Sequence, residues 1–210
     1  MTYIFDLDGT LIDSRYRHVF LMKTILEKHG IPDRGRIEDG SYFEYKANGL
    51  SGKAFLMDIL TLDEQICEEI LEEWVHHIED DGLLFKDKLF SDAMSTCKKI
   101  LNQVHNTIFF LTARRNENGL KKELEYLGLN SFASEVVVVD PYEKSKVTAL
   151  KQIVKRNRKA MMIGDTEVDY EAALKADIPY YMLNRGFRSE QFWNCQRVTS
   201  YPSLESLMCH

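Results

Sequence analysis

Two aspartates near the start of the chain stand where a carboxylate could act as a nucleophile. Asp6 and Asp8 directly follow the apolar segment 2–5 and precede a Gly-Thr pair. A second acidic pair, Asp165 and Asp169, follows another apolar segment late in the chain. Side chains two residues apart point the same way on an extended backbone. A turn at the glycine that follows would let the two early carboxylates take different roles beside one reacting atom.

These carboxylates indicate a metal site if the fold brings them together. Several carboxylates in one place repel one another and cannot all ionise unless a cation neutralises them. Oxygen ligands alone favour Mg²⁺. A hydroxyl at Thr112 and an ammonium at Lys144 or Lys146 also follow predicted strands. A hard cation, a hydroxyl and an ammonium together suit the charged oxygens of a transferring phosphoryl group.

Five short apolar segments supply the elements that would position these side chains. Runs such as 108–111 and 136–139 do not alternate with polar residues, which is typical of strands covered on both faces in a parallel sheet. Because ligands bind at the carboxyl ends of such strands, the residues after each strand should converge on one edge. The predicted strands are 2–5, 107–111, 135–139, 159–163 and 180–183.

Helical patterns fill the gaps between the later strands. Apolar residues recur at helical spacing over 94–104, 120–127, 147–154 and 170–174. This alternation of strands and helices predicts right-handed crossovers. It therefore indicates a doubly wound, Rossmann-like α/β core built on a parallel sheet.

The stretch 14–85 is an exception, because it contains no convincing strand and at least three helical segments. One of its helices is predicted to begin at Thr61, where Thr61 and Glu64 fit a capping box. An all-helical block inserted directly after the first strand predicts a small cap domain at 14–85. The α/β core is then formed by 1–13 and 86–210.

The composition narrows the class of protein. The chain has 210 residues, of which 44% are hydrophobic and 29% charged, as in a soluble globular protein. A net charge of −6 argues against a nucleic-acid or anionic membrane surface, and no apolar run approaches the ~20 residues of a membrane span. We expect no signal peptide, because 2–5 is already a strand. The four cysteines are scattered, which favours reduced thiols in a cytoplasmic protein, and the choice between monomer and homodimer stays open.

The segment FDLDGTLIDS, followed in order by Thr112, a downstream lysine and IGDTEVD, resembles the haloacid dehalogenase superfamily. The helical insertion after the first motif is similar to that of its subfamily I, with a C1-type cap. The resemblance implies that Asp6 is the nucleophile that forms an aspartyl-phosphate. It also implies that Asp8 protonates the leaving oxygen and then acts as a base on the attacking water.

The resemblance further implies a Mg²⁺ site at the same edge of the sheet. Its ligands would be Asp6, the backbone carbonyl of Asp8, and Asp165. Asp169 would be either a direct ligand or one step removed from the metal.

A hydroxyl and a lysine complete the motifs of the family. Thr112 matches the hydroxyl that holds a phosphoryl oxygen. We expect Lys146 to be the phosphate-binding lysine, because it opens a predicted helix, and Lys144 is the alternative. The proline that family members usually carry beside this lysine is absent here.

An aspartate two residues after the nucleophile resembles the phosphatase and phosphomutase branch of the superfamily rather than the dehalogenase branch. We therefore expect Mg²⁺-dependent hydrolysis of a small-molecule phosphomonoester. A phosphomutase acting on a sugar phosphate is the nearest alternative, and a non-catalytic phosphometabolite-binding protein is another. The intact set Asp6, Asp8, Thr112, Lys146 and Asp165 argues against the binding protein.

Recognition of the rest of the substrate is expected to come from the cap and from basic residues near the strand ends. A loop over 46–53 contains two glycines and ends at Lys53, and this lysine could reach a second anionic or hydroxyl group. Arg114 and Lys144 could contact the same substrate. The alternative for the loop is a flexible connection between helices, and the alternative for Arg114 is a solvated position on the surface. The identity of the physiological substrate stays open.

Overall fold

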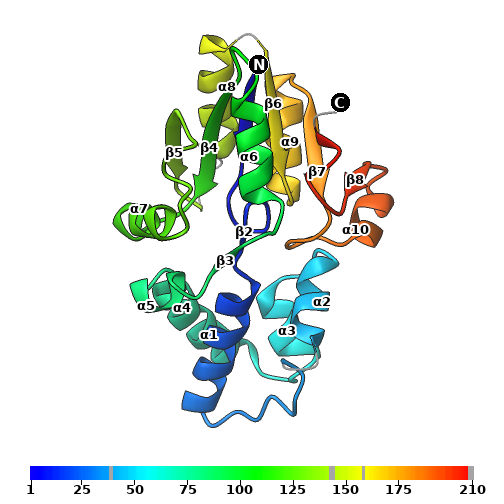
Figure 1. Ribbon diagram of the computed structural model, residues 1–210. Coiled ribbons are helices and arrows are strands. Elements are labelled where there is room, and N and C mark those ends of the chain that lie inside the picture. The colour runs from blue at the N-terminus through cyan, green and yellow to red at the C-terminus, as the bar shows by residue number, and fades with distance from the viewer. Residues whose placement is uncertain (38–39, 142–144, 158, 208–210) are drawn as a thin grey trace.

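The chain folds around one parallel β-sheet, and a helical lobe lies below the ends of its strands (Figure 1). The computed structural model describes residues 1–37, 40–141, 145–157 and 159–207. The sheet has six strands in the order β5-β4-β1-β6-β7-β8, and neighbouring strands pair in parallel. These strands are β1 (Thr2–Phe5), β4 (Thr107–Ala113), β5 (Glu135–Val139), β6 (Ala160–Gly164), β7 (Tyr180–Leu183) and β8 (Ser200–Tyr201).

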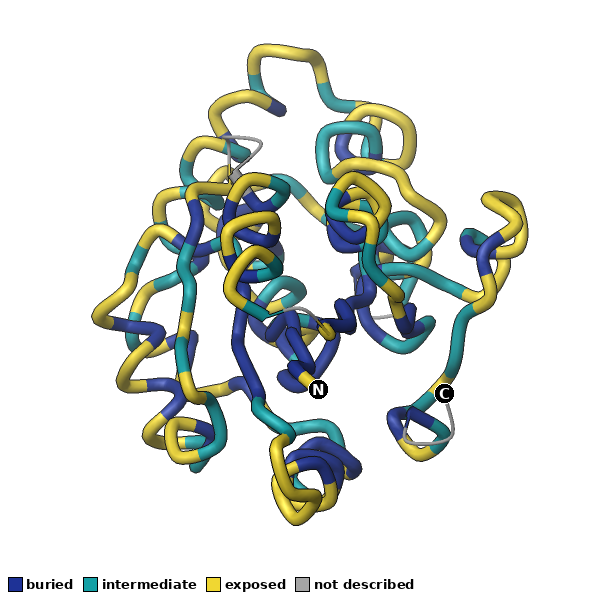
Figure 2. Tube along the Cα trace, turned by 90° about the horizontal axis from the view of Figure 1, so that it is seen from above, coloured by how far each residue is buried: buried dark blue, intermediate teal, exposed yellow. Residues whose placement is uncertain are grey.

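The five strands predicted from apolar runs are confirmed, with β4 extended to Ala113 and β6 shifted by one residue. Alternate side chains of each strand enter different hydrophobic clusters, so both faces of the sheet are covered. In β1, Tyr3 and Phe5 pack on one face and Ile4 on the other. Figure 2 shows buried residues at the middle of the molecule and exposed residues on the outer sides of the helices.

Helices cover the two faces of the sheet. On the face of Tyr3 lie α6 (Ala93–Leu101) and α7 (Glu117–Tyr126). On the face of Ile4 lie α8 (Ser145–Arg156) and α9 (Glu167–Ala176), and the short α10 (Glu190–Cys195) follows β7. The predicted α/β class with a parallel sheet is therefore confirmed.

A separate helical lobe is formed by α1 (Arg15–Lys28), α2 (Ser41–Ala47), α3 (Gly52–Asp58), α4 (Glu64–His77) and α5 (Asp81–Leu84). Its helices enclose a hydrophobic cluster of their own. The predicted capping box at the start of α4 is wrong. Asp63 is the N-cap residue and accepts from the Ile66 N–H, whereas Thr61 has a left-handed backbone with φ of 56°.

Two short strands join the lobes. β2 (Ile12–Asp13) carries the chain from the sheet to the helical lobe, and β3 (Lys88–Leu89) carries it back. The two strands pair antiparallel. The carboxyl ends of the main strands point toward the helical lobe, so the residues that follow β1, β4 and β6 lie between the lobes (Figure 1). Among the described residues, no helix is long and apolar enough to cross a bilayer.

Candidate active site

Strand register brings the first acidic motif beside the later ones. Phe5, the last residue of β1, pairs with Phe110 of β4 on one side and with Ile163 of β6 on the other. The Asp6 N–H donates to the Ile163 carbonyl at 2.9 Å, which continues the pairing one residue further. Asp6 therefore lies between the ends of β4 and β6, where Thr112 and Asp165 occur.

The turn after Asp6 requires a glycine. Gly9 has φ of +75°, and a Cβ atom built on it would lie 2.1 Å from Asp165 Oδ2. The same loop sends the Thr10 hydroxyl toward Asp165 Oδ1 at 3.4 Å. From the other side, the Phe187 N–H donates to Asp165 Oδ2 at 2.6 Å. The Asp165 carboxylate is thus fixed by two loops that follow different strands.

Three buried carboxylates form one cluster at this point. Oxygens of Asp6, Asp165 and Asp169 lie within 4.8 Å of one another. Burial raises the pKa of Asp6 to about 7, with Lys146 opposing the rise and Asp169 adding to it. Burial and the charge of Asp6 raise the pKa of Asp165 well above its usual value. An oxygen-rich cluster that resists full ionisation by itself fits a divalent cation.

Lys146 supplies a positive charge to the cluster. Its ammonium lies 3.0 Å from Asp6 Oδ1 and 2.6 Å from Asp169 Oδ1. Burial alone would lower the pKa of Lys146, but Asp169 and Asp6 outweigh it and raise the pKa, so the side chain stays charged. The other oxygen of Asp169 accepts from the Thr166 N–H and hydroxyl at the start of α9. Both oxygens of Asp169 are therefore engaged by protein donors.

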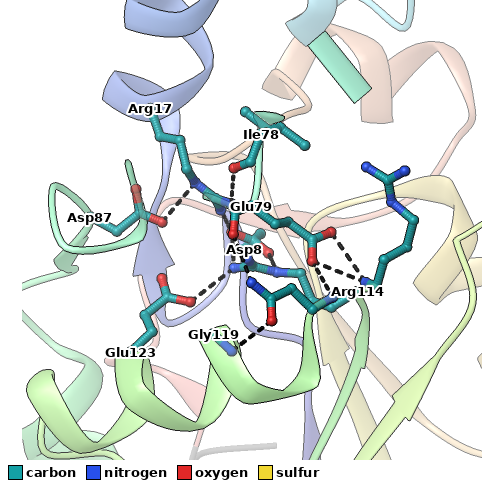
Figure 3. A network of polar contacts seen from close by, with 10 residues as sticks. Asp8, Arg17, Ile78, Glu79, Asp87, Arg114, Gly119 and Glu123 are labelled. Carbon is teal, nitrogen blue, oxygen red and sulfur yellow. Dashed lines mark hydrogen bonds and ion pairs between the residues drawn. The ribbon is translucent and has the colours of Figure 1, made fainter. Parts of the chain in front are cut away.

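Asp8 lies in a different environment from Asp6, within the network of polar contacts that Figure 3 shows. Arg17 Nη2 contacts Asp8 Oδ1 at 2.6 Å, and Arg114 Nε contacts Asp8 Oδ2 at 2.7 Å. Behind these arginines, Asp87 lies 3.0 Å from Arg17 Nε, and Glu123 lies 3.2 Å from Arg114 Nη2. Burial would raise the pKa of Asp8, but the guanidinium charges of Arg114 and Arg17 hold it below its usual value.

Comparison with known proteins assigns the chain to a family. Residues 3–183, which extend from the second residue of β1 to the end of β7, match the family of haloacid dehalogenase-like hydrolases. The chain belongs to this family. The superfamily that the sequence motifs resemble is therefore confirmed.

Individual members of the family are distant relatives of this chain. A phosphoglycolate phosphatase of Aquifex aeolicus is 24% identical over 179 residues, which cover 82% of this chain and 79% of that protein. A solved haloacid dehalogenase-like hydrolase of Streptococcus pneumoniae has a TM-score of 0.73 and 18% identity, with 99% of this chain and 97% of that chain covered. A Clostridium acetobutylicum protein described as a predicted phosphatase has a TM-score of 0.71 and 22% identity, covering 98% of this chain and 95% of its own. These structures share the fold.

The structure brings most of the predicted site residues of this haloacid dehalogenase-like chain together. Asp6, Lys146, Asp165 and Asp169 form the carboxylate cluster. Thr112 is buried near the end of β4, inside the strand rather than after it.

The predicted substrate contacts fare differently. Arg114 is buried against Asp8 rather than lying on the surface. Lys53 does not join the site, because its ammonium pairs with Glu64 at 2.7 Å and Glu68 at 3.1 Å on the helical lobe. Lys144 lies outside the described residues.

Sequence reasoning missed the residues behind Asp8. Glu123 falls between Leu120 and Leu124 on the apolar stripe of α7 and is fully buried. Arg17 occupies a buried position of α1 in the same way. A charged residue on an apolar helical face is a signal that it has a buried partner, since such residues are seldom buried unpaired. The stripe alone does not say which partner that is.

Proposed function

We propose that this chain is a divalent-metal-dependent phosphatase that hydrolyses small phosphate monoesters through a phosphorylated Asp6. The observation that carries the proposal is the buried cluster of Asp6, Asp165 and Asp169 around Lys146 at the strand ends. The names of the Aquifex aeolicus and Clostridium acetobutylicum proteins agree with this direction. In this proposal the helical lobe acts as the cap, and residues 1–13 and 86–210 form the catalytic core.

The first step needs a nucleophile and a seat for the phosphoryl group. An oxygen of the Asp6 carboxylate attacks phosphorus, and the bond from phosphorus to the ester oxygen breaks. The Lys146 ammonium, which Asp169 holds at 2.6 Å, is close enough to Asp6 to bind a phosphoryl oxygen there. The Thr112 hydroxyl would bind another phosphoryl oxygen. Asp169 thereby acts through the lysine, which agrees with the protein donors on both of its oxygens.

A divalent cation would be held by Asp6, Asp165 and the backbone carbonyl of Asp8. Bound there, it would neutralise negative charge on the phosphoryl oxygens and let the carboxylates stay ionised. Asp165 is already positioned by the Phe187 N–H. The chemistry of this donor set, which is oxygen only, favours Mg²⁺.

Asp8 moves protons in both steps of the proposal. In the first, its carboxyl gives a proton to the departing ester oxygen. In the second, its carboxylate takes a proton from water, which attacks phosphorus and breaks the bond to Asp6. Arg17 and Arg114 hold Asp8 as a carboxylate, which suits the second step. The first step requires one of its oxygens to leave its arginine and carry the proton.

Phosphate release from p-nitrophenyl phosphate with Mg²⁺ tests this proposal. Asp6→Asn keeps the shape of the side chain but removes the nucleophile, so turnover should fall by roughly 10⁴-fold or more. Asp177→Asn, at an exposed left-handed position after α9, is the matched control and should retain full activity. An Asp6→Asn protein that keeps more than a few per cent of the activity would overturn the mechanism.

A further inference from the structure

A cavity of about 360 Å³ lies beside Asp8 between the two lobes. Its volume is near the lower end of the ~300–1,000 Å³ of small-molecule sites, so it suits a group of one or two rings rather than a nucleotide. Asp8, Ala113 and Arg114 line its core side. Because Asp8 faces the departing ester oxygen, the leaving group of a substrate must extend into this cavity. The inference that follows therefore rests on the proposed function.

Arg17 and Arg114, two of the charged residues that line this cavity, already have protein partners. Arg17 contacts Asp8 and Asp87, and it also donates to the Ile78 carbonyl at 3.0 Å. Arg114 contacts Asp8 and Glu123. The positive charges of Arg17 and Arg114 are thus largely neutralised by carboxylates of the protein before any substrate binds.

Glu79, on the helical side of the cavity, is engaged as well. Its carboxylate accepts from the Arg115 N–H at 3.0 Å and from the Asn116 N–H at 2.7 Å. A second charge placed among Arg17, Arg114 and Glu79 would therefore have to displace an existing contact or remain buried without a partner.

The rest of the wall is aromatic and apolar. The His18 ring centre lies 5.2 Å from that of Trp74 and 4.7 Å from that of Phe187. Burial, together with the charges of Lys46 and Arg17, holds the pKa of His18 well below its usual value, so its ring is neutral. Among the described residues, the helical lobe contributes Arg17, His18, Trp74, Val75, Ile78 and Glu79 to the lining.

Lys46 lies against this wall but does not line the cavity. Its ammonium is 5.2 Å from the centre of the Trp74 ring and 5.5 Å from that of the Phe187 ring, and 3.3 Å from His18 Nδ1. The lysine therefore contacts the same rings that line the cavity. As a cation beside the wall, it makes a useful contrast in the experiment.

We propose that the substrate is a phosphate monoester of an uncharged alcohol that carries an aromatic or similarly broad apolar group. Such a group would stack on Trp74, His18 and Phe187 while its ester oxygen faces Asp8. Burial of apolar surface against these rings would be favourable, and no charge would lose its water. A small carboxylated ester such as phosphoglycolate would gain little from the same wall.

The kcat/KM values of benzyl phosphate, methyl phosphate and phosphoglycolate test the inference. Benzyl alcohol is a poor leaving group, so a preference for its ester reports binding of the ring rather than chemical reactivity. We expect kcat/KM for benzyl phosphate to exceed that for each of the other two by about tenfold or more. Phosphoglycolate hydrolysed as well as benzyl phosphate would overturn the inference alone. Inactivity toward all three esters and p-nitrophenyl phosphate would overturn the proposed function and the inference with it.

Variants in α4 separate the wall from general structure. Trp74→Ala should lower kcat/KM for benzyl phosphate about tenfold and change that for methyl phosphate by less than about twofold. Leu71→Ala, one turn earlier in the apolar cluster of the helical lobe, is the matched control and should leave the ratio of the two values unchanged. Equal losses on both esters in Trp74→Ala would contradict a binding role for this ring.

A second substitution tests the same wall if Trp74→Ala does not fold. Val75→Lys adds a cation to the partly exposed lining of the cavity. It should raise the ratio of kcat/KM for phosphoglycolate to kcat/KM for benzyl phosphate. Lys46→Met should leave that ratio near the wild-type value. A selective loss of phosphoglycolate hydrolysis in Lys46→Met would show that the lysine recognises a carboxylate, and it would overturn the inference.

Discussion

At the scale of single residues, the site separates two aspartates that stand two positions apart. Asp6 faces Lys146 and two other carboxylates, whereas Asp8 faces two arginines. Burial acts to raise the pKa of both; at Asp6 it prevails over the opposing charge of Lys146, whereas at Asp8 the charges of Arg114 and Arg17 outweigh it. Neighbouring side chains of one type thereby become suited to different parts of one reaction.

The acidic residues behind the arginines add a second consequence. Asp8, Asp87 and Glu123 are three carboxyls around the two guanidinium groups of Arg17 and Arg114. One proton on the carboxyls balances the charge of the group. Burial is the largest cause that raises the pKa of Asp87 to about 9, which assigns this proton to Asp87.

Stability should therefore fall as the pH rises toward about 9. Folded Asp87 keeps its proton up to about pH 9, whereas in the unfolded chain the proton leaves near its ordinary pKa of about 3.9. The stability that protonated Asp87 contributes is complete below the unfolded value and is lost as the pH rises through the folded value. Asp87→Asn cannot ionise, so its free energy of unfolding should change less between neutral pH and pH 9 than that of wild type.

Denaturant unfolding across this pH range measures the difference. Asp177→Asn, an exposed position, is the control and should follow the wild-type curve. Parallel curves for wild type and Asp87→Asn would show that Asp87 ionises normally in the folded chain.

At the scale of elements, the start of α7 joins the lobes. The carboxylate of Glu79, which lies just after α4, accepts hydrogen bonds from the backbone N–H groups of Arg115 and Asn116, the two residues that precede α7. The Asn116 side chain donates to the Glu79 backbone carbonyl at 3.0 Å. A carboxylate is favourable at a helix N-terminus, where N–H groups lack partners within the helix. On the other side of the site, the Ser189 N–H donates to the Ala47 carbonyl at the end of α2. The lobes are thus in contact both just before α7 and just before α10.

Removal of the Glu79 carboxylate should loosen one of these contacts. In Glu79→Ala, the N–H groups of Arg115 and Asn116 lose an acceptor that carries a charge, a contact worth about 1.5–3 kcal/mol. Their amide hydrogens should exchange at least about tenfold faster than in wild type. Glu72→Ala, an exposed position on α4, should leave both rates unchanged. Unchanged rates in Glu79→Ala would mean that the lobes stay together without it.

The elements that could be predicted from the sequence are those whose pattern is long or repeated. Buried strands such as β1 and β6 are continuous apolar runs, and the motifs after them locate Asp6 and Asp165. The two-residue strands β2, β3 and β8 are too short to show a period. The sequence places the start of α4 at Thr61 rather than at Asp63, because both residue types are good N-caps. Only the backbone conformation distinguishes them.

It could not be predicted either which lysine of the predicted loop 46–53 faces the site. Lys46 lies in the last turn of α2 and Lys53 in the first turn of α3, yet Lys46 packs against rings at the cavity and Lys53 pairs with glutamates of α4. The periodicity of neither short helix fixes that orientation. Packing between the lobes decides it, and no local pattern records that packing.

At the scale of the whole molecule, the paired strands β2 and β3 connect two bodies with separate hydrophobic clusters. The carboxylate cluster is formed by residues after β1 and β6, whose carboxyl ends point toward the helical lobe (Figure 1). A cation that binds this cluster in the folded chain alone should stabilise the whole fold, because the unfolded chain has no such site.

Thermal unfolding with and without Mg²⁺ measures this coupling without reference to activity. Mg²⁺ at a hundred times its dissociation constant should add about 2.7 kcal/mol, or roughly 5–10 °C in Tm for a chain of this size. NaCl at the same ionic strength should not reproduce the shift. Asp165→Asn should lose the shift, and a wild-type Tm that is indifferent to Mg²⁺ would place the cation elsewhere.

The central claim is that a phosphoryl group passes through Asp6. Wild-type protein quenched with acid during turnover of p-nitrophenyl phosphate, digested and analysed by mass spectrometry, tests it most directly. The account predicts a peptide that is heavier by one phosphoryl group, with the modification at Asp6, and its absence from Asp6→Asn and from protein quenched before substrate is added. A phosphorylated residue other than Asp6, or active protein that carries no phosphoryl group at any stage of turnover, would contradict the account.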